Sequence, residues 1–311
     1  MRPMPPSPAA ALIVLAASAA VLGLAPILVR LADTGPAAAG FWRFALALPW
    51  LMLLVLRPGA PADERGPGRP SALMALAALF FVLDLGFWHY SIAFTSVATA
   101  TTLTNLTPVS VTAVAWLVFR ERPRALFLLA LAVALFGAWT MSAGADGRQG
   151  SNPRLGDLFA AVTALWYAGD FLTVKALRGR HSAGRIMLWS TALGAPLLLG
   201  LSLALGEQLT PASLAGWWAC AGLGLVHVAG HGGVAWALGR LPAAPSPVAV
   251  LLQPGGGPIL GSLLFAETMT AAQMLGGGAV VAGVVLAQWS AKQRSGRVGS
   301  GGPAGPTTAA P

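Results

Sequence analysis

Charged residues are scarce in this chain. Asp, Glu, Lys and Arg make up 9% of its 311 residues, whereas 56% of the residues are hydrophobic. An ordinary soluble domain carries about 25% charged residues, so the composition disfavours a water-soluble fold and indicates a membrane protein. The net charge of +9 does not indicate a nucleic-acid partner, because the basic residues are scattered in short links between apolar runs.

Cysteine and nucleotide-binding motifs are also lacking. The single cysteine, Cys220, lies inside an apolar stretch, so the chain has no disulfide framework and this side chain is expected to be buried. No phosphate-binding loop of the Walker A type is present, which argues against a nucleotide-driven pump. We expect neither a cofactor nor a metal ion.

Ten apolar runs are long enough to cross a membrane. A spanning helix needs about 20 mostly apolar residues for a hydrocarbon core of about 30 Å. The first run is longer than the core of a signal peptide, and nine more runs follow it, so we treat it as a span. The predicted spans are 10–31, 37–56, 72–92, 97–118, 125–142, 156–176, 186–205, 214–238, 243–264 and 271–289.

The positions of the basic residues predict the orientation. Cytoplasmic links carry an excess of Lys and Arg. With the N-terminus inside the cell, fifteen of the 19 basic residues fall on the cytoplasmic side, three fall outside, and Arg43 lies within a span. We therefore expect a multi-pass protein of the cell inner membrane, surrounded by the lipid bilayer, with both termini cytoplasmic.

The chain also repeats itself. Trp42 and Pro49 match Trp189 and Pro196 at a shift of 147 residues. At a shift of 146 the matching pairs are Gly86 and Gly232, Ala98 and Ala244, Pro108 and Pro254, Leu117 and Leu263, Phe119 and Phe265, Glu121 and Glu267, and Gly137 and Gly283. Each copy holds five predicted helices, and because five is an odd number the second copy enters the membrane from the opposite side.

These observations predict an all-α membrane protein with ten transmembrane helices arranged as two inverted five-helix repeats. The first repeat covers residues 10–144 and the second covers residues 156–290, and residues 145–155 link them. Residues 1–9 form an N-terminal cytoplasmic segment. Residues 291–311 are rich in Gly, Ser, Pro and Thr and cannot bury apolar surface, so we expect a disordered cytoplasmic tail.

Several of the repeated segments resemble a known family. Residues 87–90, 107–108 and 119–123, their counterparts 252–254 and 265–267, and the stretch 40–44 are similar to the EamA repeats of the drug/metabolite transporter superfamily. The resemblance covers roughly residues 10 to 290. It implies ten helices, a substrate cavity between the two repeats, and transport by alternating access. It does not imply a particular substrate.

Three polar residues fall near the predicted middle of the membrane: Asp84, Asn105 and Gln253. An ionisable group there costs from about 2.5 kcal/mol upward, so Asp84 is a functional candidate. Asp84 either accepts a substrate ammonium or a coupling proton, or is fixed by neighbouring helices for a structural purpose. Since secondary transporters place their substrate sites at this depth, the three residues predict one site.

Asn105 and Gln253 each have two interpretations. Asn105 shares a helical face with three threonines, Thr101, Thr102 and Thr112, and Pro108 leaves a backbone carbonyl one turn earlier without its usual partner. This polar stripe either lines the cavity or makes hydrogen bonds between helices. Gln253 precedes Pro254 and a Gly-rich stretch, so it either lines the cavity or lies at a close helix contact.

Two further charged residues lie inside predicted spans. Asp170 follows Trp166 and Tyr167 by one turn near the cytoplasmic end of its helix, where it either contacts substrate or reaches interfacial water. Arg43 has the uncharged counterpart Ser190. It either binds an anionic group or a carboxylate partner, or extends to the outer surface while its alkyl stem stays in the membrane.

His227 and His231 have the i, i+4 spacing that places two imidazoles on one helical face. No third ligand accompanies them, so polar packing or substrate contact is favoured over metal binding. His89 lies beside Trp88 at the outer end of its helix, where it is either interfacial or a proton relay. Among the tryptophans, Trp88 and Trp166 are the two expected to face a cavity.

The function that these features favour is secondary transport of a small metabolite, such as an amino acid or a related compound, by alternating access. The resemblance favours export, coupled to a proton or a counter-substrate. An intramembrane enzyme would need a nucleophile with its base or a cluster of carboxylates at membrane depth, and neither stands out. A non-transporting membrane partner or structural subunit would not explain the inverted repeat. The oligomeric state is not indicated.

Overall fold

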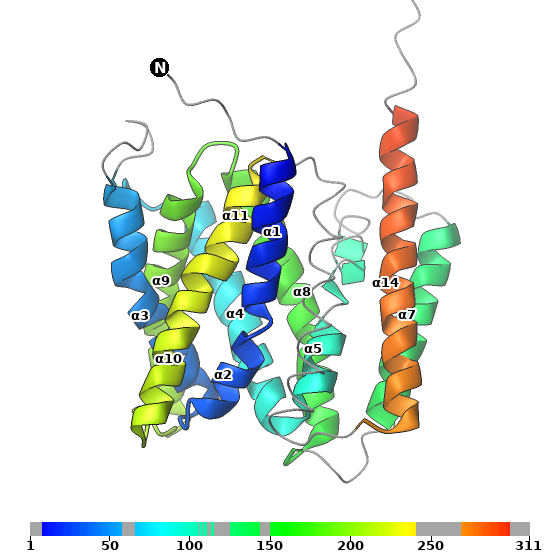
Figure 1. Ribbon diagram of the computed structural model, residues 1–311, viewed down its shortest axis with the longest axis horizontal. Helices are drawn as coiled ribbons and strands as arrows, with labels where there is room; N and C mark the ends of the chain where they lie inside the picture. Colours follow the sequence, from blue (N-terminus) through cyan, green and yellow to red (C-terminus); the bar gives the residue numbers. More distant parts are fainter. Residues whose placement is uncertain are drawn as a thin grey trace, which may run out of the picture.

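The computed structural model describes residues 8–57, 66–104, 106–107, 109–110, 113–114, 125–143, 150–240 and 269–298, and its regular structure in these ranges is helical. Most of the helices run side by side along one direction (Figure 1). They are α1 (Pro8–Leu22), α2 (Ala25–Leu31), α3 (Pro36–Leu56), α4 (Ala72–Phe94), α5 (Val97–Thr104), α7 (Ala125–Ala143), α8 (Pro153–Leu177), α9 (Ala183–Ala204), α10 (Leu214–Val226), the π-helix η1 (His227–His231), α11 (Gly232–Leu238) and α14 (Ala271–Val298).

Five described helical segments are long and apolar enough to cross a membrane, namely Ile13–Leu31, α3, α4, α8 and α9. Shorter apolar segments lie in α7 and α14. Many large apolar side chains point outward, such as Leu53 at 62% exposure and Trp139 at 66%. An outer surface of this kind suits lipid rather than water. The all-α membrane fold is confirmed, whereas the number of ten spans stays a prediction, because 243–264 and most of 105–124 lie outside the described residues.

The first predicted span is broken in two. α1 ends at Leu22, Gly23 and Leu24 form a turn, and α2 begins at Ala25. Pro26 occupies the first turn of α2, where its missing N–H costs no hydrogen bond. A helix that continued through Pro26 would lack the backbone hydrogen bond from residue 26 to the carbonyl of Leu22. The break therefore forms at the flexible Gly23, three residues earlier.

The eighth predicted span contains a π-helical turn. Residues His227–His231 form η1 between α10 and α11. A π turn inserts one extra residue into an α-helix and shifts the faces of the segments on either side. Gly230 within η1, and Gly232 and Gly233 directly after it, reduce the preference for a regular α-helix.

The helix ends gather at two opposite ends of the bundle. At the end that we name the Glu207 end, Gly35 N–H donates to Gln208 O, and Asn152 N–H donates to Phe94 O. At the other, the Arg178 end, Arg178 donates to Ala235 O. The start of α1 and the end of α14 both lie at the Arg178 end, the upper end in Figure 1.

Helices related by the sequence repeat run in opposite directions. α3 runs from the Glu207 end to the Arg178 end, and its counterpart α9 runs back. α4 runs toward the Glu207 end, and its counterpart, formed by α10, η1 and α11, runs away from it.

The packing also follows the repeat, because replacing both helices of a packed pair by their counterparts gives another packed pair. α4 packs against α8. Correspondingly, the α10–α11 segment, which is the counterpart of α4, packs against α1 and α2, which are the counterpart of α8. α4 also packs on α9, and α10 packs on α3. Two further extensive contacts, α3 with α9 and α7 with α14, each join a helix to its own counterpart.

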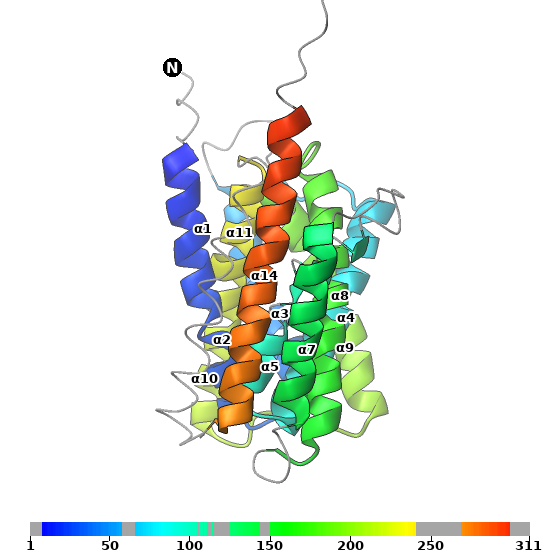
Figure 2. The ribbon, with the colours of Figure 1, turned by 90° about the vertical axis from the view of Figure 1, so that its right-hand side faces the viewer.

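α7 and α14 lie side by side in both views (Figures 1 and 2), and Figure 1 shows them apart from α3, α9 and α10. Their contact is unusually close at two glycines. A Cβ added at Gly137 would lie 2.6 Å from Gly276 O, and one added at Gly283 would lie 2.7 Å from Ala134 Cβ. Because these glycines occupy matching positions in the two repeats, each helix presents the same small-residue surface to the other.

Candidate functional site

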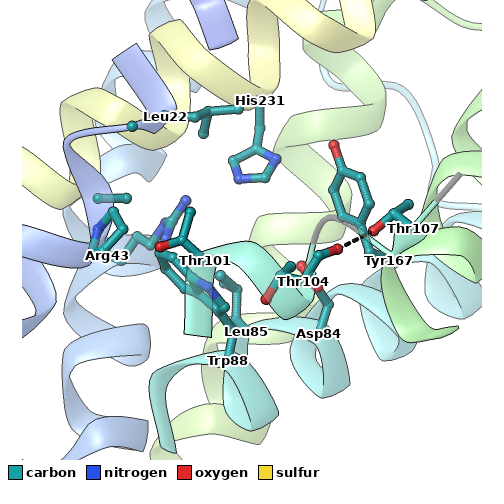
Figure 3. Close-up of a pocket in the computed structure, with 13 residues that line it drawn as sticks. Leu22, Arg43, Asp84, Leu85, Trp88, Thr101, Thr104, Thr107, Tyr167 and His231 are labelled. Carbon is teal, nitrogen blue, oxygen red and sulfur yellow. Dashed lines mark hydrogen bonds between the residues drawn. The ribbon is translucent and has the colours of Figure 1, made fainter. Parts of the chain in front are cut away.

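A cavity of about 70 Å³ lies among helices from both repeats. Its wall combines opposite charges with hydroxyl, aromatic and aliphatic side chains, shown in Figure 3. The lining residues are Leu22, Gly23, Ala25, Pro26, Arg43, Asp84, Leu85, Trp88, Thr101, Thr104, Thr107, Tyr167 and His231. The volume is enough for a few water molecules or a small polar group.

Arg43 reaches this cavity from α3. Its side chain is 1% exposed, and its Nε and Nη1 atoms are buried without a hydrogen-bond partner among the described residues. The guanidinium carbon lies 5.9 Å from the centre of the Trp88 ring, within the range of a cation–π contact. The interpretation that Arg43 extends to the outer surface is therefore wrong, because the side chain turns inward.

Asp84 reaches the same cavity from α4 and is 5% exposed. Asp84 interacts electrostatically with the positive charge of Arg43 and with the negative charge of Asp170. In Figure 3 the Arg43 guanidinium lies near Thr101 and Trp88, whereas Asp84 lies on the side of Thr104 and Tyr167. The two charges thus line different parts of one cavity.

The hydroxyl groups come from successive turns of one segment. Thr101, Thr104 and Thr107 follow one another at three-residue spacing and all line the cavity. Thr104 Oγ1 donates to Ala100 O at 2.8 Å, and Thr107 Oγ1 donates to Thr104 O at 2.8 Å. These bonds leave the hydroxyl oxygens as possible acceptors for a ligand.

A second cavity of about 20 Å³ lies next to the first and shares Tyr167 and His231 with it. Asp170 and Ser190 also line it. Asp170 is 8% exposed, and its Oδ1 atom is buried without a hydrogen-bond partner in the described part of the chain. Ser190, the counterpart of Arg43, likewise has a buried Oγ without such a partner.

His227 and His231 differ in their surroundings. His231 lines both cavities. His227 is fully buried, its Nε2 lies 2.8 Å from Thr191 Oγ1, and its ring stacks on Phe81 with centroids 5.2 Å apart. The two imidazoles lie 5.6 Å apart between centroids. The described residues contain no group of three His, Cys, Asp or Glu side chains that could hold a metal ion.

The remaining candidates are distributed as follows. Trp88 and Tyr167 line the main cavity, whereas Trp166 packs against Phe80 and Phe87. His89 is entirely buried and its Nδ1 lies 2.9 Å from Pro36 O. Asn105 and Gln253 lie outside the described residues, so their placement at the site stays a prediction.

Sequence reasoning missed two parts of the wall. Thr104 and Thr107 were not singled out, although their spacing from Thr101 places them on one side of a helix. The break between α1 and α2 also forms wall, through Gly23, Ala25 and Pro26. The pair Gly23 and Pro26 inside an apolar run was the available signal for a break.

The arrangement fits a small ligand that carries both signs of charge. A guanidinium can donate to a carboxylate, and a carboxylate can accept from an ammonium group. Because both side chains are buried, each pays a desolvation cost that a ligand of opposite charge would offset. Trp88 and Tyr167 add flat apolar faces beside the charged groups.

Known proteins with similar sequences agree on the class. The sequence profile of the EamA-like transporter family matches this chain twice, over residues 9–143 and 154–289. An uncharacterized transporter from Archaeoglobus fulgidus is 29% identical over 228 residues, which are 73% of this chain and 80% of that protein.

A solved crystal structure of another protein superposes on 89% of this chain and 98% of its own, with a TM-score of 0.62. Its sequence identity is 17%, so the likeness concerns the fold. With two family matches that together cover most of its length, the chain belongs to the EamA-like transporter family of the drug/metabolite transporter superfamily and is a membrane transporter.

Proposed function

We propose that this protein is a secondary transporter of a small zwitterionic metabolite, such as an amino acid or a related compound. The observation that carries the proposal is that Arg43 and Asp84, two buried and oppositely charged side chains, line one cavity. A charged group inside a membrane protein is costly, so a pair that lines an open space is more readily explained by a ligand than by packing.

In this proposal Arg43 binds the substrate carboxylate and Asp84 binds its ammonium group. Trp88 and Tyr167 contact the apolar part of the substrate, and the α5 hydroxyls accept or donate hydrogen bonds. Asn105 and Gln253 complete the site from the fourth and ninth predicted spans. The energy of binding comes from replacing water at the two charges with fixed partners.

Alternating access by two inverted repeats is supported by the helix directions and by the packing. Counterpart helices run in opposite directions. Replacing both helices of a packed pair by their counterparts gives another packed pair. A structure with this symmetry can adopt two conformations in which the repeats exchange roles, each opening the cavity to a different side. We propose that residues 10–144 and 156–290 are these repeats.

The coupling ion in this proposal is a proton or a counter-substrate, and Asp170 is positioned to take part. Its cavity adjoins the main one, and Tyr167 and His231 lie between them. The direction that the family resemblance favours is export. We propose that the Arg178 end is cytoplasmic, because Arg57, Arg69, Arg178 and Arg185 lie there, which places both termini in the cytoplasm of an inner-membrane protein.

The test has two stages. Culture media of cells with and without this protein are first compared for zwitterionic metabolites, and the candidates are then measured for uptake into proteoliposomes. Arg43→Gln and Asp84→Asn should each lower transport by tenfold or more, whereas Arg180→Gln, at an exposed position, should not. All variants are checked for folding by gel filtration and thermal unfolding. Normal transport by folded Arg43→Gln and Asp84→Asn proteins would refute the assignment.

A further inference from the structure

A larger cavity, of about 260 Å³, lies at the Arg178 end between α3, α9 and α11. We name it the basic cavity, because three arginines from three elements line it: Arg57 follows α3, Arg178 follows α8, and Arg240 follows α11. None of the described residues that line it is acidic. A cavity with this lining attracts an anion.

Two of the guanidinium groups are held in position on the wall. Arg178 Nε donates to Ala235 O at 3.0 Å. Arg240 lies over the ring of Trp236, with 3.9 Å between the guanidinium carbon and the ring centre, and its Nη1 donates to Trp236 O at 3.0 Å. Fixed guanidinium groups lose less conformational entropy when they bind an anion than mobile side chains do.

The first repeat shows what occupies the corresponding place at the Glu207 end. Ala183, Gly184 and Trp236 line the basic cavity. Their counterparts, at shifts of 147 residues for the first two and 146 for the third, are Pro36, Ala37 and Tyr90.

A carboxylate fills that corresponding place. Glu207 accepts hydrogen bonds from Ala37 N–H at 3.2 Å and Ala38 N–H at 2.9 Å, in the first turn of α3, and Tyr90 Oη donates to it. At the start of α9, the corresponding place is therefore lined by three arginines and a cavity, whereas the start of α3 is capped by a carboxylate of the second repeat. Since none of the described residues fills this place with a negative charge, the comparison favours an anion bound at the three arginines.

The rest of the wall distinguishes a lipid from a soluble anion. Leu51, Val55 and Met187 form a buried apolar side, and Leu54, at 46% exposure, continues it to the outer surface of α3. Next to Leu54, Leu53 and Leu56 are more than half exposed. An apolar wall that runs from the arginines to the surface facing the lipid fits a ligand with an anionic head and hydrocarbon chains.

We propose that the basic cavity binds an anionic phospholipid, with its phosphate at Arg57, Arg178 and Arg240 and an acyl chain along Leu51 and Leu54. The lipid occupies the place that Glu207 fills at the other end and joins α3, α9 and α11 at the Arg178 end. This site is separate from the cavity of Arg43 and Asp84, and it holds a resident lipid rather than the transported substrate.

The full-length protein in a neutral detergent provides the test. Phosphatidylglycerol and phosphatidylcholine with identical acyl chains are titrated separately, and binding is followed by native mass spectrometry and thermal unfolding. Arg57→Gln/Arg240→Gln removes two charges from the cavity and leaves Arg178, which contacts the backbone, in place. The matched control is Arg69→Gln/Arg180→Gln, which removes two exposed charges at the same end that do not line the cavity.

We expect the wild-type protein and the control to bind phosphatidylglycerol at least tenfold more tightly than phosphatidylcholine, and the cavity variant to lose that preference by about tenfold. If the double variant does not fold, Arg57→Gln alone, which changes an exposed side chain, gives the same comparison. Inorganic phosphate and glycerol 3-phosphate form a third arm. The proposal would be overturned if either soluble anion stabilised the protein as much as phosphatidylglycerol does. It would also be overturned if the wild-type protein bound both lipids equally, or if the control variant lost its preference for phosphatidylglycerol as much as the cavity variant.

Discussion

Trp42 and Trp189 make the same hydrogen bond at opposite ends of the bundle. Trp42 Nε1 donates to Leu209 O at 2.8 Å, and Trp189 Nε1 donates to Pro67 O at 2.7 Å. Each tryptophan lies near the start of its helix and contacts the loop of the other repeat. The two bonds therefore join the repeats at both ends through residues that the 147-residue shift relates.

Replacing either tryptophan by phenylalanine should destabilise the protein. Trp42→Phe and Trp189→Phe keep an aromatic ring and remove the indole donor, so each should lower the free energy of unfolding by about 1 kcal/mol. Thermal unfolding in detergent measures the effect. Trp218→Phe is the control, because Trp218 is 72% exposed. An equal loss in the control would show that ring size, and not the hydrogen bond, matters.

Glu207 caps a helix of the other repeat, so it should contribute to stability together with Tyr90. α3 begins after Gly35, which has no side chain to cap it, and Glu207 accepts from two backbone N–H groups there. Glu207→Gln cannot accept from both and also from the phenol, and we expect a loss of roughly 1–3 kcal/mol. A double-mutant cycle with Tyr90→Phe should show coupling, whereas strictly additive losses would contradict the contact.

The contact between α7 and α14 predicts a position-specific effect on one helix. At Gly283 a side chain would collide with Ala134, so Gly283→Val should cost about 1–3 kcal/mol and reduce the folded yield. At Gly278 a Cβ meets nothing within 4 Å, so Gly278→Val should be nearly neutral. Yield and thermal unfolding of the two variants test this directly. Equal effects at both positions would mean that α7 and α14 do not pack as described.

A coupling role for Asp84, the alternative to its contact with the substrate ammonium, would predict a separation of two activities. If its carboxylate gains and loses a proton as the cavity changes sides, Asp84→Asn should abolish transport driven by a pH gradient and leave substrate exchange partly intact. Purified variant in liposomes, with and without the gradient, provides the measurement. Gradient dependence like that of the wild-type protein would exclude Asp84 as the coupling residue. Asp170 and His227 would then be the next candidates.

The orientation predicts the outcome of reporter fusions. Fusions after Arg65, Arg122, Arg180 and Lys292 should all report a cytoplasmic location, because the links at these positions hold most of the basic residues. A fusion in the loop after Leu209 should report the opposite side. A periplasmic reading at Lys292 would contradict the predicted arrangement.

The all-helical membrane fold could be predicted because length and hydropathy dominate the energetics of a membrane span. The predicted span 37–56 and the observed α3 (Pro36–Leu56) differ by one residue. Breaks inside spans could not be placed in this way. The break before α2 had a local signal in Gly23 and Pro26, whereas η1 lies where Gly230 packs against Leu22, and an apolar run gives no information on such a contact.

For the site, counting residues from the helix ends identified Asp84 as buried, but depth alone does not fix the direction of a side chain. The sequence allowed both an inward and an outward orientation of the Arg43 side chain. Its position beside Trp88 depends on the packing of α3 against α4. Thr102 was expected on the same face as Thr101, yet Thr102 Oγ1 donates to Ala98 O and Thr102 does not line the cavity. Helical periodicity is too coarse to distinguish adjacent residues of a short helix.

The exchange of partners between counterpart helices has a consequence for biosynthesis. Because the most extensive described contacts join the first half of the chain to the second, the helices of the first half enter the bilayer before most of their partners have been made. The nascent half must wait there as a loosely associated set of helices, much like one subunit of a dimer whose second subunit is still on the ribosome. The pairing of α7 with α14 therefore has to wait until α14 has been made.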